Sequence, residues 1–400
     1  MRIVIVGGGQ AAVSFAAEAR RAAPSAGITM LSAEPVHPYQ RPPLSKAYLA
    51  GTMPLDRLLL RGPEWFDEHE IAFEPGVEVD AIDREKMEVR AEDRAWSYDA
   101  LFIATGSEPR RLPASVGGEL ENVFAMRTLA DADALAPALR SARSMVVVGG
   151  GYIGLEAAAV ARSFGVEVVL LEAAQRILGR VACEQTADYF RDLHRRNGVE
   201  VIESVALNRL EGEHHVEGAR LDDDRSVTAD VAVVGIGIQP RTAIAERADL
   251  DCDDGIVVDE RCRTSDPCIY AAGDCVRFSF RGQQVRLESV PHAIHQAEVA
   301  ARNVVGADET YEAKPWFWSD QYDVKLQIAG LNTGFDRTVV RPGRREGAQS
   351  VWYYGGDVLL AVDAMNDAPA YMVGRKAIEA GMSPAPEKIA DPSVDLRSLV

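Results

Sequence analysis

Short apolar runs alternate with helical patterns through the first 300 positions of the chain. Residues 3–6 and 145–148 are uninterrupted apolar runs, the pattern of strands buried on both faces of a parallel sheet. Each run leads into glycines and then into apolar residues at helical spacing. Further runs of the same kind lie at 28–31, 100–107, 166–171, 231–238 and 268–272. This alternation predicts an α/β fold built on parallel sheets.

The pattern departs from this plan in two places. Alternation near 77–79 and 87–89 predicts a small antiparallel meander, and from 316 onward short alternating strands predict a smaller α+β domain. The strand–glycine–helix plan at 3 returns at 145, which is an internal duplication. We therefore expect two Rossmann-like dinucleotide-binding domains and a C-terminal domain, with boundaries at 1–110 plus 241–315, 111–240 and 316–400.

Each repeated run leads into a glycine fingerprint for a dinucleotide. The first fits G-x-G-x-x-A at Gly7, Gly9 and Ala12, and the second fits G-x-G-x-x-G at Gly149, Gly151 and Gly154. The first glycine permits a tight turn, the second lets backbone N–H groups approach a pyrophosphate, and the small third residue lets the helix pack on its strand. One fingerprint is weak evidence. Two, each followed by an acid that ends the next strand (Glu34, Glu172), indicate electron transfer between two dinucleotides.

Charge and composition narrow the choice of partners. Lys+Arg number 43 against 61 Asp+Glu, and the net charge of −18 makes nucleic acid and anionic membranes poor partners. No apolar run approaches the ~20 residues of a membrane span. Arg2 leads directly into the first strand, so we expect no signal peptide and a cytoplasmic protein. The five cysteines show no C-x-x-C and no metal-ligand spacing, so we expect reduced thiols and no metal site.

Five motifs in a fixed order point to one group of enzymes. They are Arg-Pro-Pro-Leu-Ser-Lys at 41–46, Gly-Gly-Gly-Tyr-Ile-Gly-Leu-Glu at 149–156, Gly-Ile-Gly at 235–237, Gly-Asp-Cys at 273–275 and Pro-Trp-Phe-Trp-Ser-Asp-Gln at 315–321. Together they resemble the FAD-dependent, glutathione-reductase-type pyridine nucleotide oxidoreductases, and among them the NADH-dependent ferredoxin reductases of oxygenase and cytochrome P450 systems. The resemblance covers essentially the whole chain. It implies FAD, NADH as donor, and a [2Fe–2S] ferredoxin that feeds a cytochrome P450 or a ring-hydroxylating oxygenase.

The resemblance also implies where FAD binds. Gly7, Gly9 and Ala12 would hold the pyrophosphate, Glu34 the ribose, and Asp274 the ribityl or pyrophosphate part. The alternatives are an ordinary turn residue for Glu34 and a helix or turn cap for Asp274. A helix that begins with Pro291 at its first position would direct its positive end at the flavin. The other implied FAD contacts are Ala11, Arg41, Pro43, Lys46, Val79, Ala104, Thr105, Gly106, Arg127, Val290 and Trp318.

Lys46 and Glu156 are the implied catalytic pair. In related reductases these positions meet beside the flavin N5 edge, so we expect an ion pair; two separate surface residues are the alternative. Hydride passes directly from nicotinamide C4 to flavin N5, so no general base is needed and the protein supplies alignment and electrostatics. His292 and His295 therefore need no catalytic role.

The second fingerprint is implied to bind NADH. Its contacts would be Gly149, Gly151, Tyr152, Ile153, Gly154, Glu172, Arg180 and Gly237. Glu172 ends the second strand of this domain, where a carboxylate accepts both ribose hydroxyls and repels a 2′-phosphate. This predicts NADH over NADPH. Arg176 and Arg180 lie downstream and either soften the preference or lie on a helix surface.

Two further hypotheses concern the acceptor. Trp316 and Trp318 share one face of a strand, so one is expected against the flavin, with core packing as the alternative. Because ferredoxins of this kind are acidic like this chain, docking needs a local basic patch, for which Arg61 and Lys325 are candidates.

Two other functions stay open. Rubredoxin, oxygen or a quinone could replace the ferredoxin, although the thiol-free segment 41–46 argues against peroxide or disulfide acceptors. An NADH-sensing interaction protein, as among apoptosis-inducing-factor relatives, is the second. We expect a monomer.

Overall fold

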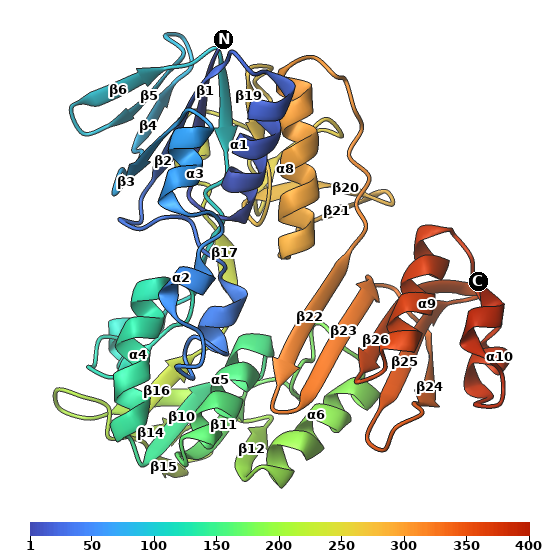
Figure 1. The fold of residues 1–400 in the computed structure, drawn as a ribbon. Coiled ribbons are helices and arrows are strands. Elements are labelled where there is room, and N and C mark those ends of the chain that lie inside the picture. The colour runs from blue at the N-terminus through green and yellow to red at the C-terminus, as the bar shows by residue number, and fades with distance from the viewer. The chain divides into compact units, whose positions relative to one another are not determined.

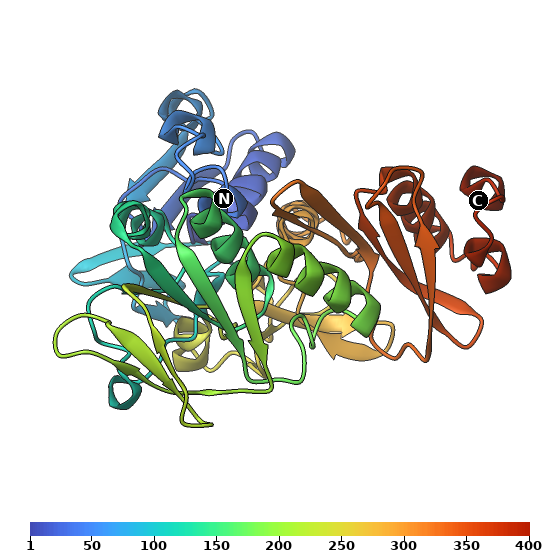
Figure 2. The ribbon, with the colours of Figure 1, turned by 90° about the horizontal axis from the view of Figure 1, so that it is seen from below.

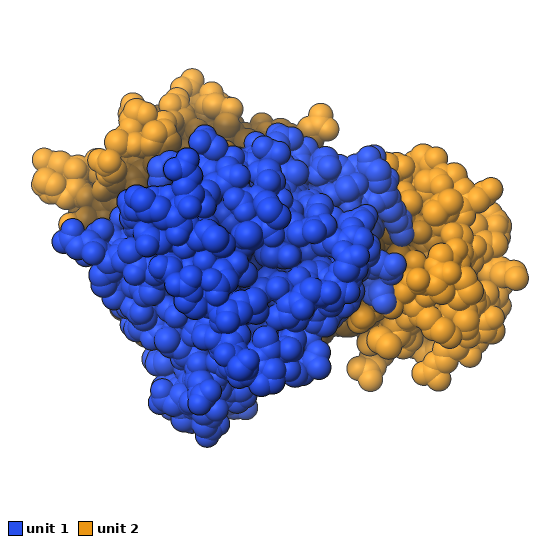
Figure 3. Space-filling model, turned by 90° about the horizontal axis from the view of Figure 1, so that it is seen from above, with its two compact units in different colours: residues 1–40, 54–108, 238–315 blue, residues 41–53, 109–237, 316–400 orange.

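A computed structural model describes all residues of the chain, 1–400. The chain forms two compact units, coloured separately in Figure 3. The first unit comprises residues 1–40, 54–108 and 238–315, and the second comprises 41–53, 109–237 and 316–400. The segment 41–53 thus belongs to the second unit although both its sequence neighbours belong to the first.

A five-stranded parallel sheet in the order β19-β7-β1-β2-β3 organises the first unit. Its strands are β1 Arg2–Val6, β2 Gly27–Ser32, β3 Ile71–Pro75, β7 Ala100–Ile103 and β19 Ile269–Ala271. Helices α1 Gln10–Ala22 and α8 Val290–Val304 lie side by side against it (Figure 1). The predicted strands at 3–6, 28–31, 100–107 and 268–272 all fall on members of this sheet.

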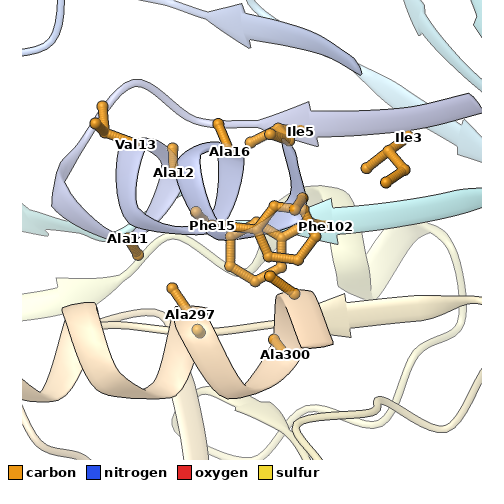
Figure 4. Packing of buried hydrophobic residues seen from close by; sticks show 14 of the residues in the cluster. Ile3, Ile5, Ala11, Ala12, Val13, Phe15, Ala16, Phe102, Ala297 and Ala300 are labelled. Atoms are coloured by element: carbon orange, nitrogen blue, oxygen red, sulfur yellow. The ribbon is translucent and has the colours of Figure 1, made fainter. Parts of the chain in front are cut away.

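Small side chains let these two helices approach closely. Phe15 of α1 stacks on Phe102 of β7 with 3.9 Å between ring centroids, and both rings are fully buried. Figure 4 shows Ala12 and Ala16 of α1 in the same cluster as Ala297 and Ala300 of α8. Alanine at these positions removes the side-chain bulk that would keep the helices apart.

A three-stranded antiparallel sheet forms the meander of the first unit. Its strands are β4 Ala81–Asp83, β5 Glu88–Ala91 and β6 Arg94–Ser97. The prediction of a strand at 77–79 is wrong by a few residues. Val77 and Val79 are buried but join no ladder; the Val77 N–H donates to the Ser32 carbonyl instead. The remaining elements are α2 Leu55–Leu58, α3 Pro63–Glu68, β8 Ser107–Pro109, β17 Ile238–Pro240, α7 Ala243–Arg247, β18 Ile256–Val257, β20 Val276–Phe280 and β21 Gln283–Val285.

The second unit repeats the parallel plan in the order β12-β11-β10-β16-β9. Its strands are β9 Val123–Phe124, β10 Ser144–Val148, β11 Glu167–Glu172, β12 Val199–Glu203 and β16 Val231–Val234, and its helices are α4 Leu129–Ser141, α5 Tyr152–Ser163 and α6 Glu184–Arg196. A short sheet of β13 Leu207–Glu211, β14 Gly218–Leu221 and β15 Ser226–Thr228 accompanies it, with 3-10 turns η1 Pro42–Ser45 and η2 Ala114–Val116. The predicted internal duplication is therefore present.

An antiparallel sheet in the order β22-β23-β26-β25-β24 completes the second unit. Its strands are β22 Trp316–Gln321, β23 Val324–Gly330, β24 Arg337–Pro342, β25 Gln349–Gly355 and β26 Val358–Met365. Helix α9 Ala368–Glu379 covers one face (Figure 2), followed by α10 Pro386–Ala390 and η3 Leu396–Leu399. The predicted α+β character from 316 onward is confirmed. None of the helices combines the length and apolarity needed to cross a bilayer.

Candidate functional site

The first glycine loop is tightly packed at Gly7 and open at Gly9. Gly7 has φ +139°, and a Cβ there would lie 2.2 Å from the Ala104 carbonyl oxygen. A Cβ at Gly9, by contrast, would meet nothing within 4 Å. Gly9 is also the N-cap of α1 and offers no side-chain cap. The first N–H groups of this 13-residue helix therefore face open space, which fits an anionic pyrophosphate.

The second loop reproduces this geometry on β10 and α5. Gly149 has φ +106°, and a Cβ there would lie 2.5 Å from the Gly235 carbonyl oxygen. Gly151 is the uncapped N-cap of α5, and a Cβ there would meet nothing within 4 Å. A Cβ at Gly154 would lie 2.1 Å from the Gly149 carbonyl oxygen, so only glycine fits. Two separate loops in the chain thus offer unpaired helix N-terminal donors.

The two acids after the loops are held differently. Glu172, at the end of β11, accepts from the Gly150 N–H and from the Ala174 N–H, each at 2.8 Å, so its carboxylate is fixed beside the second loop. Glu34 accepts a hydrogen bond from the Tyr39 hydroxyl. Glu172 is the last residue of β11 and Glu34 lies two residues beyond β2, and each of these strands neighbours the strand that leads into a glycine loop, where a ribose hydroxyl is expected.

Buried polar groups gather where β19 ends in the first unit. Asp274 accepts from the Ser107 hydroxyl at 3.0 Å, and Gly273 N–H donates to Gln296 Oε1 at 3.0 Å. Gln296 Nε2 and His292 Nε2 are buried without a protein partner. Burial lowers the pKa of His292 to about 4, so the ring is neutral at pH 7. These orphaned atoms beside the Gly-Asp turn fit a site that a polar ligand completes.

Helix α8 begins one residue earlier than predicted. Ser289 is the N-cap, its hydroxyl accepts from the His292 N–H, and Val290 rather than Pro291 is the first helical residue. The Ser289 hydroxyl accepts this hydrogen bond, and a proline side chain has no atom that could accept it. Proline is tolerated at the second helical position because the N–H groups of the first turn have no intrahelical partner.

Lys46 and Glu156 form the predicted ion pair inside the second unit. Lys46 Nζ lies 2.6 Å from Glu156 Oε2, and their side chains are 18% and 3% exposed. Ser45 Oγ also donates to Oε2, and Ser319 Oγ donates to Oε1, both at 2.6 Å. Ser45 is the last residue of the 3-10 turn η1, and Lys46 follows it directly. Glu156 lies on α5 and Ser319 on β22. Three segments far apart in sequence therefore fix one buried carboxylate.

Comparison with known proteins identifies the chain. A family model described as pyridine nucleotide-disulphide oxidoreductase matches residues 1–297, and one described as reductase C-terminal matches residues 316–400. The chain belongs to the pyridine nucleotide-disulphide oxidoreductase family.

Relatives of this family match along their full length. Rhodocoxin reductase of Rhodococcus erythropolis is 39% identical over 99% of this chain and 94% of its own. The ferredoxin–NAD(+) reductase component of the anthranilate 1,2-dioxygenase system of Burkholderia cepacia is 41% identical over 99% and 98%. Among solved structures, the covalent putidaredoxin reductase–putidaredoxin complex superposes with a TM-score of 0.96 and 38% identity, covering 100% of this chain and 97% of that chain.

The remaining residues expected at the NAD loop lie together in the second unit of this family member. Tyr152 follows Gly151 directly, and its buried hydroxyl has no protein partner. Ile153 is exposed in the first turn of α5. A Cβ at Gly237 would lie 3.4 Å from the Arg180 guanidinium, so Arg180 reaches this turn. Arg176 instead donates to the Ala182 carbonyl, which favours a local structural role.

The other residues expected at FAD divide between the units. Val79, Ala104, Thr105, Gly106, Ala11 and Val290 lie in the first unit, and Arg41, Pro43, Lys46, Arg127 and Trp318 lie in the second. The Arg41 guanidinium donates to the Arg127 carbonyl at 2.9 Å, so these two meet. Thr105 Oγ1 donates to the Arg241 carbonyl, which ties the turn after β7 to the returning chain.

Trp316 and Trp318 share a face of β22, as their spacing predicts. Their ring centroids are 5.4 Å apart. Trp316 also packs against Tyr371 and the Arg375 guanidinium, so it belongs to the core that α9 covers. Trp318 is half-buried and has no such partners from α9.

Neither cysteines nor acidic clusters build a further redox or metal centre. All five cysteines are free, and burial raises the pKa of the Cys262 and Cys275 thiols, which keeps them neutral. No group of three or more His, Cys, Asp or Glu side chains is placed to hold a metal ion.

Arg61 and Lys325 lie in different units: Arg61 lies over the Trp65 ring, and Lys325 is exposed on β23.

Sequence reasoning missed several residues around Glu156. Ser45, Ser319 and Gln321 lie inside motifs that were singled out for their neighbours, so their polar type inside an apolar segment was an available signal. His194 lies in an ordinary amphipathic helical pattern and gives no such signal, yet it is fully buried.

Proposed function

We propose that this chain is an FAD-dependent reductase that transfers electrons from NADH to a ferredoxin. The observation that carries this is the pair of glycine loops, each at an uncapped helix N-terminus, in one member of a pyridine nucleotide oxidoreductase family. FAD, when bound, supplies a carrier that accepts two electrons as hydride and releases them singly. The balance is one NADH and two oxidised ferredoxins giving NAD⁺, two reduced ferredoxins and one proton.

The first unit holds FAD in this proposal. The N–H groups around Gly9 and the first turn of α1 bind the pyrophosphate, and Glu34 binds the adenosine ribose. Asp274 and the buried polar atoms Gln296 Nε2 and His292 Nε2 would serve the middle part of the cofactor or a water that bridges to it. Ser107 orients Asp274 for this task by donating to its carboxylate.

The second unit holds NADH. Gly151 and the first turn of α5 bind the pyrophosphate, and Glu172 binds the ribose hydroxyls. The Gly150 N–H of the loop and the Ala174 N–H after β11 hold the Glu172 carboxylate in place, so a 2′-phosphate would meet a fixed negative charge. NADH is therefore preferred over NADPH.

Lys46 and Glu156 act on the redox step itself. Lys46 would supply a positive charge to bound FAD, and Glu156 holds the Lys46 ammonium in one position because the carboxylate is itself anchored by Ser45 and Ser319. Their contribution is electrostatic and orientational; neither abstracts a proton. Trp318 is the aromatic contact to the ring.

A [2Fe–2S] ferredoxin of a cytochrome P450 or ring-hydroxylating oxygenase system is the proposed acceptor. The relatives named for rhodocoxin, for a dioxygenase system and for putidaredoxin support this class. Because the chain carries −18, docking depends on a local basic patch, with Arg61 and Lys325 as candidate members. We further propose a monomer. Free cysteines fit a reducing compartment such as the cytoplasm.

Two measurements on the purified holoprotein test this function. Anaerobic NADH is expected to bleach the flavin absorbance, and cytochrome c reduction is expected to depend strongly on one member of a panel of [2Fe–2S] ferredoxins. A colourless protein, or a flavin that NADH leaves oxidised, contradicts the proposal. A rate that depends on rubredoxin, a quinone or oxygen instead would assign the alternative acceptor, and a long-lived NADH complex without transfer would favour an interaction protein.

The role of Lys46 has its own test. Lys46→Met removes the ammonium while keeping an unbranched side chain, and we expect anaerobic flavin reduction by NADH to slow by roughly 10- to 100-fold. Lys86→Met is the matched control, because Lys86 also pairs with a carboxylate (Asp83, 3.3 Å) but is 64% exposed. Equal rates in Lys46→Met and wild type would remove Lys46 from the redox step.

A further inference from the structure

A continuous chain of hydrogen bonds runs through the second unit and ends on Glu156. Tyr322 Oη lies 3.3 Å from His194 Nδ1, and His194 Nε2 lies 2.8 Å from Gln321 Oε1. Gln321 Nε2 donates to Ser319 Oγ at 3.1 Å, and Ser319 Oγ donates to Glu156 Oε1 at 2.6 Å. The chain connects α6, β22 and α5, three elements of one compact unit.

All the inner members of this chain are withdrawn from water. Ser319, Gln321 and His194 have no measurable exposure, and only Tyr322, at the outer end, is half-buried. Ser319 and Gln321 are two positions apart on β22, so they point to the same face and can pass a hydrogen bond along the strand. Buried polar groups are retained at a cost unless each is paired, and here each is paired with the next.

The direction of every hydrogen bond follows from Glu156. Lys46 and Ser45 both donate to Oε2, so the group is an ionised carboxylate and only accepts. Ser319 must then give its single proton to Oε1 and accept from the Gln321 NH₂ group. That leaves Gln321 Oε1 to accept from His194 Nε2–H. His194 Nδ1 therefore carries a lone pair and accepts the Tyr322 proton.

This direction requires a neutral histidine, and burial provides one. Desolvation lowers the pKa of His194 to about 4, so at pH 7 the ring carries one proton. All four donors then point toward the carboxylate, and hydrogen bonds aligned in one direction polarise one another. The carboxylate is held at both oxygens, by Ser319 on one side and by Lys46 with Ser45 on the other.

We propose that His194 and Gln321 are positioning residues for hydride transfer. Acting through Ser319, they fix the rotation of the Glu156 carboxylate and thereby the place of the Lys46 ammonium. The role of the ion pair in flavin reduction rests on the proposed function. The hydrogen-bond chain itself is formed by side chains of the protein and is tested without NADH.

A second buried cluster in the same unit supplies a matched control. Thr186 on α6 and Tyr353 on β25 both donate to Asp363 on β26, and all three are buried. It joins the same helix to the same antiparallel sheet, as the His194 chain does, but its hydrogen bonds end on Asp363 and not on Glu156. Tyr353→Phe therefore removes a buried hydrogen bond of similar setting without touching the chain.

The first experiment reads the tautomer of His194. In ¹⁵N-histidine-labelled holoprotein, seven ring systems are to be resolved, and His194→Gln assigns the relevant one. We expect a neutral Nε2–H ring at pH 7 that Tyr353→Phe leaves unchanged and Gln321→Leu converts to mixed tautomers. A neutral Nδ1–H ring or a charged ring at pH 7 would overturn the chain.

The second experiment measures anaerobic flavin reduction in the same variants. Gln321→Leu keeps the side-chain volume but removes the donor to Ser319 and the acceptor for His194; we expect the rate to fall about 5- to 20-fold, with the NADH dissociation constant within about twofold. Tyr353→Phe is expected within about twofold of wild type. Equal slowing in both variants would overturn the positioning role.

A milder variant keeps the test decisive if Gln321→Leu does not fold. Tyr322→Phe removes only the outermost hydroxyl, at a half-buried position, and is expected to shift the His194 ring signals, which Tyr353→Phe leaves unchanged. Unchanged His194 ring signals in Tyr322→Phe would overturn the inference. A wild-type flavin that NADH cannot reduce would instead defeat the proposed function while leaving the tautomer result standing.

Discussion

The two glycine loops share a backbone path but differ in how tightly each helix sits on its strand. In the first loop the third position is Ala12, which is fully buried and keeps its Cβ. In the second loop the same position is Gly154, where a Cβ would lie 2.1 Å from the Gly149 carbonyl oxygen and 3.1 Å from Val147. Alanine therefore fits at the third position of the first fingerprint but not at the third position of the second.

The acids that follow the loops differ as well. Glu172 accepts from the Gly150 N–H of its own loop and from the Ala174 N–H just after β11, whereas Glu34 accepts from the Tyr39 side chain. The middle glycines show the same contrast: a Cβ at Gly150 would meet Ile177 at 2.6 Å, and one at Gly8 would meet the Ser32 hydroxyl at 2.2 Å. A different set of side chains therefore packs against each loop. The same glycine motif thus presents different surroundings to each of two nucleotides.

The largest effect is expected at Gly154. Gly154→Ala forces the helix away from the loop because a backbone carbonyl cannot move aside as a side chain can, and overpacking of this kind costs up to about 3 kcal/mol. We expect NADH affinity to fall on the order of 100-fold while the flavin content stays normal. Titration of the holoprotein with NAD⁺ measures this. Gly27→Ala, at a site where a Cβ meets nothing within 4 Å, is the control, and unchanged NAD⁺ affinity in Gly154→Ala would refute the comparison.

The donor preference is expected to follow Glu172 alone. Glu172→Gln removes the charge that repels a 2′-phosphate, so the ratio of kcat/KM for NADH to that for NADPH should fall by roughly 10-fold. Glu34→Gln, the equivalent change at the first loop, should leave that ratio unchanged and weaken FAD retention instead. The assignment of cofactors to loops is wrong if the two variants exchange these phenotypes.

The pH dependence of stability is expected to have opposite signs at two buried groups. Burial lowers the pKa of His292 to about 4, so its contribution is present above pH 6.5 and is lost as the pH falls toward 4. Burial raises the pKa of Asp363 to about 6, so its contribution is full below pH 3.8 and is lost as the pH rises through 6. The first group lies in the first unit and the second in the second unit.

Urea unfolding at pH 7.5 and pH 5 separates the contributions of His292 and Asp363 to the free energy of unfolding. Wild-type protein should lose about 2 kcal/mol through His292 on this acidification, and His292→Gln should remove that loss. In the wild type, Asp363 gains stability on the same acidification and so offsets part of the loss. Asp363→Asn removes this gain and should increase the net loss in the free energy of unfolding by about 1 kcal/mol. A His292→Gln variant with the wild-type pH dependence would show that this ring is not held neutral.

The smallest effect is expected at Ala12. Ala12→Gly gives the first loop the residue of the second, and it should reduce the free energy of unfolding by about 1 kcal/mol through lower helix propensity. FAD affinity should stay within about twofold, because the phosphate-facing N–H groups remain. A severe loss of FAD on this change would mean that the buried Ala12 methyl sets the loop position itself.

Local patterns were enough to find most of the fold and the two glycine loops. Buried strands such as β1 and β10 are apolar without interruption, and the glycine loops are contiguous in sequence, so neither depends on distant partners. The prediction of a strand at 77–79 was wrong because the sequence pattern of buried valines in an extended segment is the same whether or not a neighbouring strand pairs with it. The start of α8 was shifted because the capping role of Ser289 outweighed the signal of Pro291.

Local residue patterns were enough to establish the repeated strand–glycine–helix plan and the acid at or near the end of the second strand in each repeat, and the family resemblance indicated the Lys46–Glu156 pair. The surroundings of that pair depend on how distant segments fold together, because His194 and Gln321 are separated by 127 positions and meet at 2.8 Å. A hydrogen bond between distant segments leaves no periodicity in the chain, since it depends on where α6 and β22 come to lie and not on the residues beside either partner.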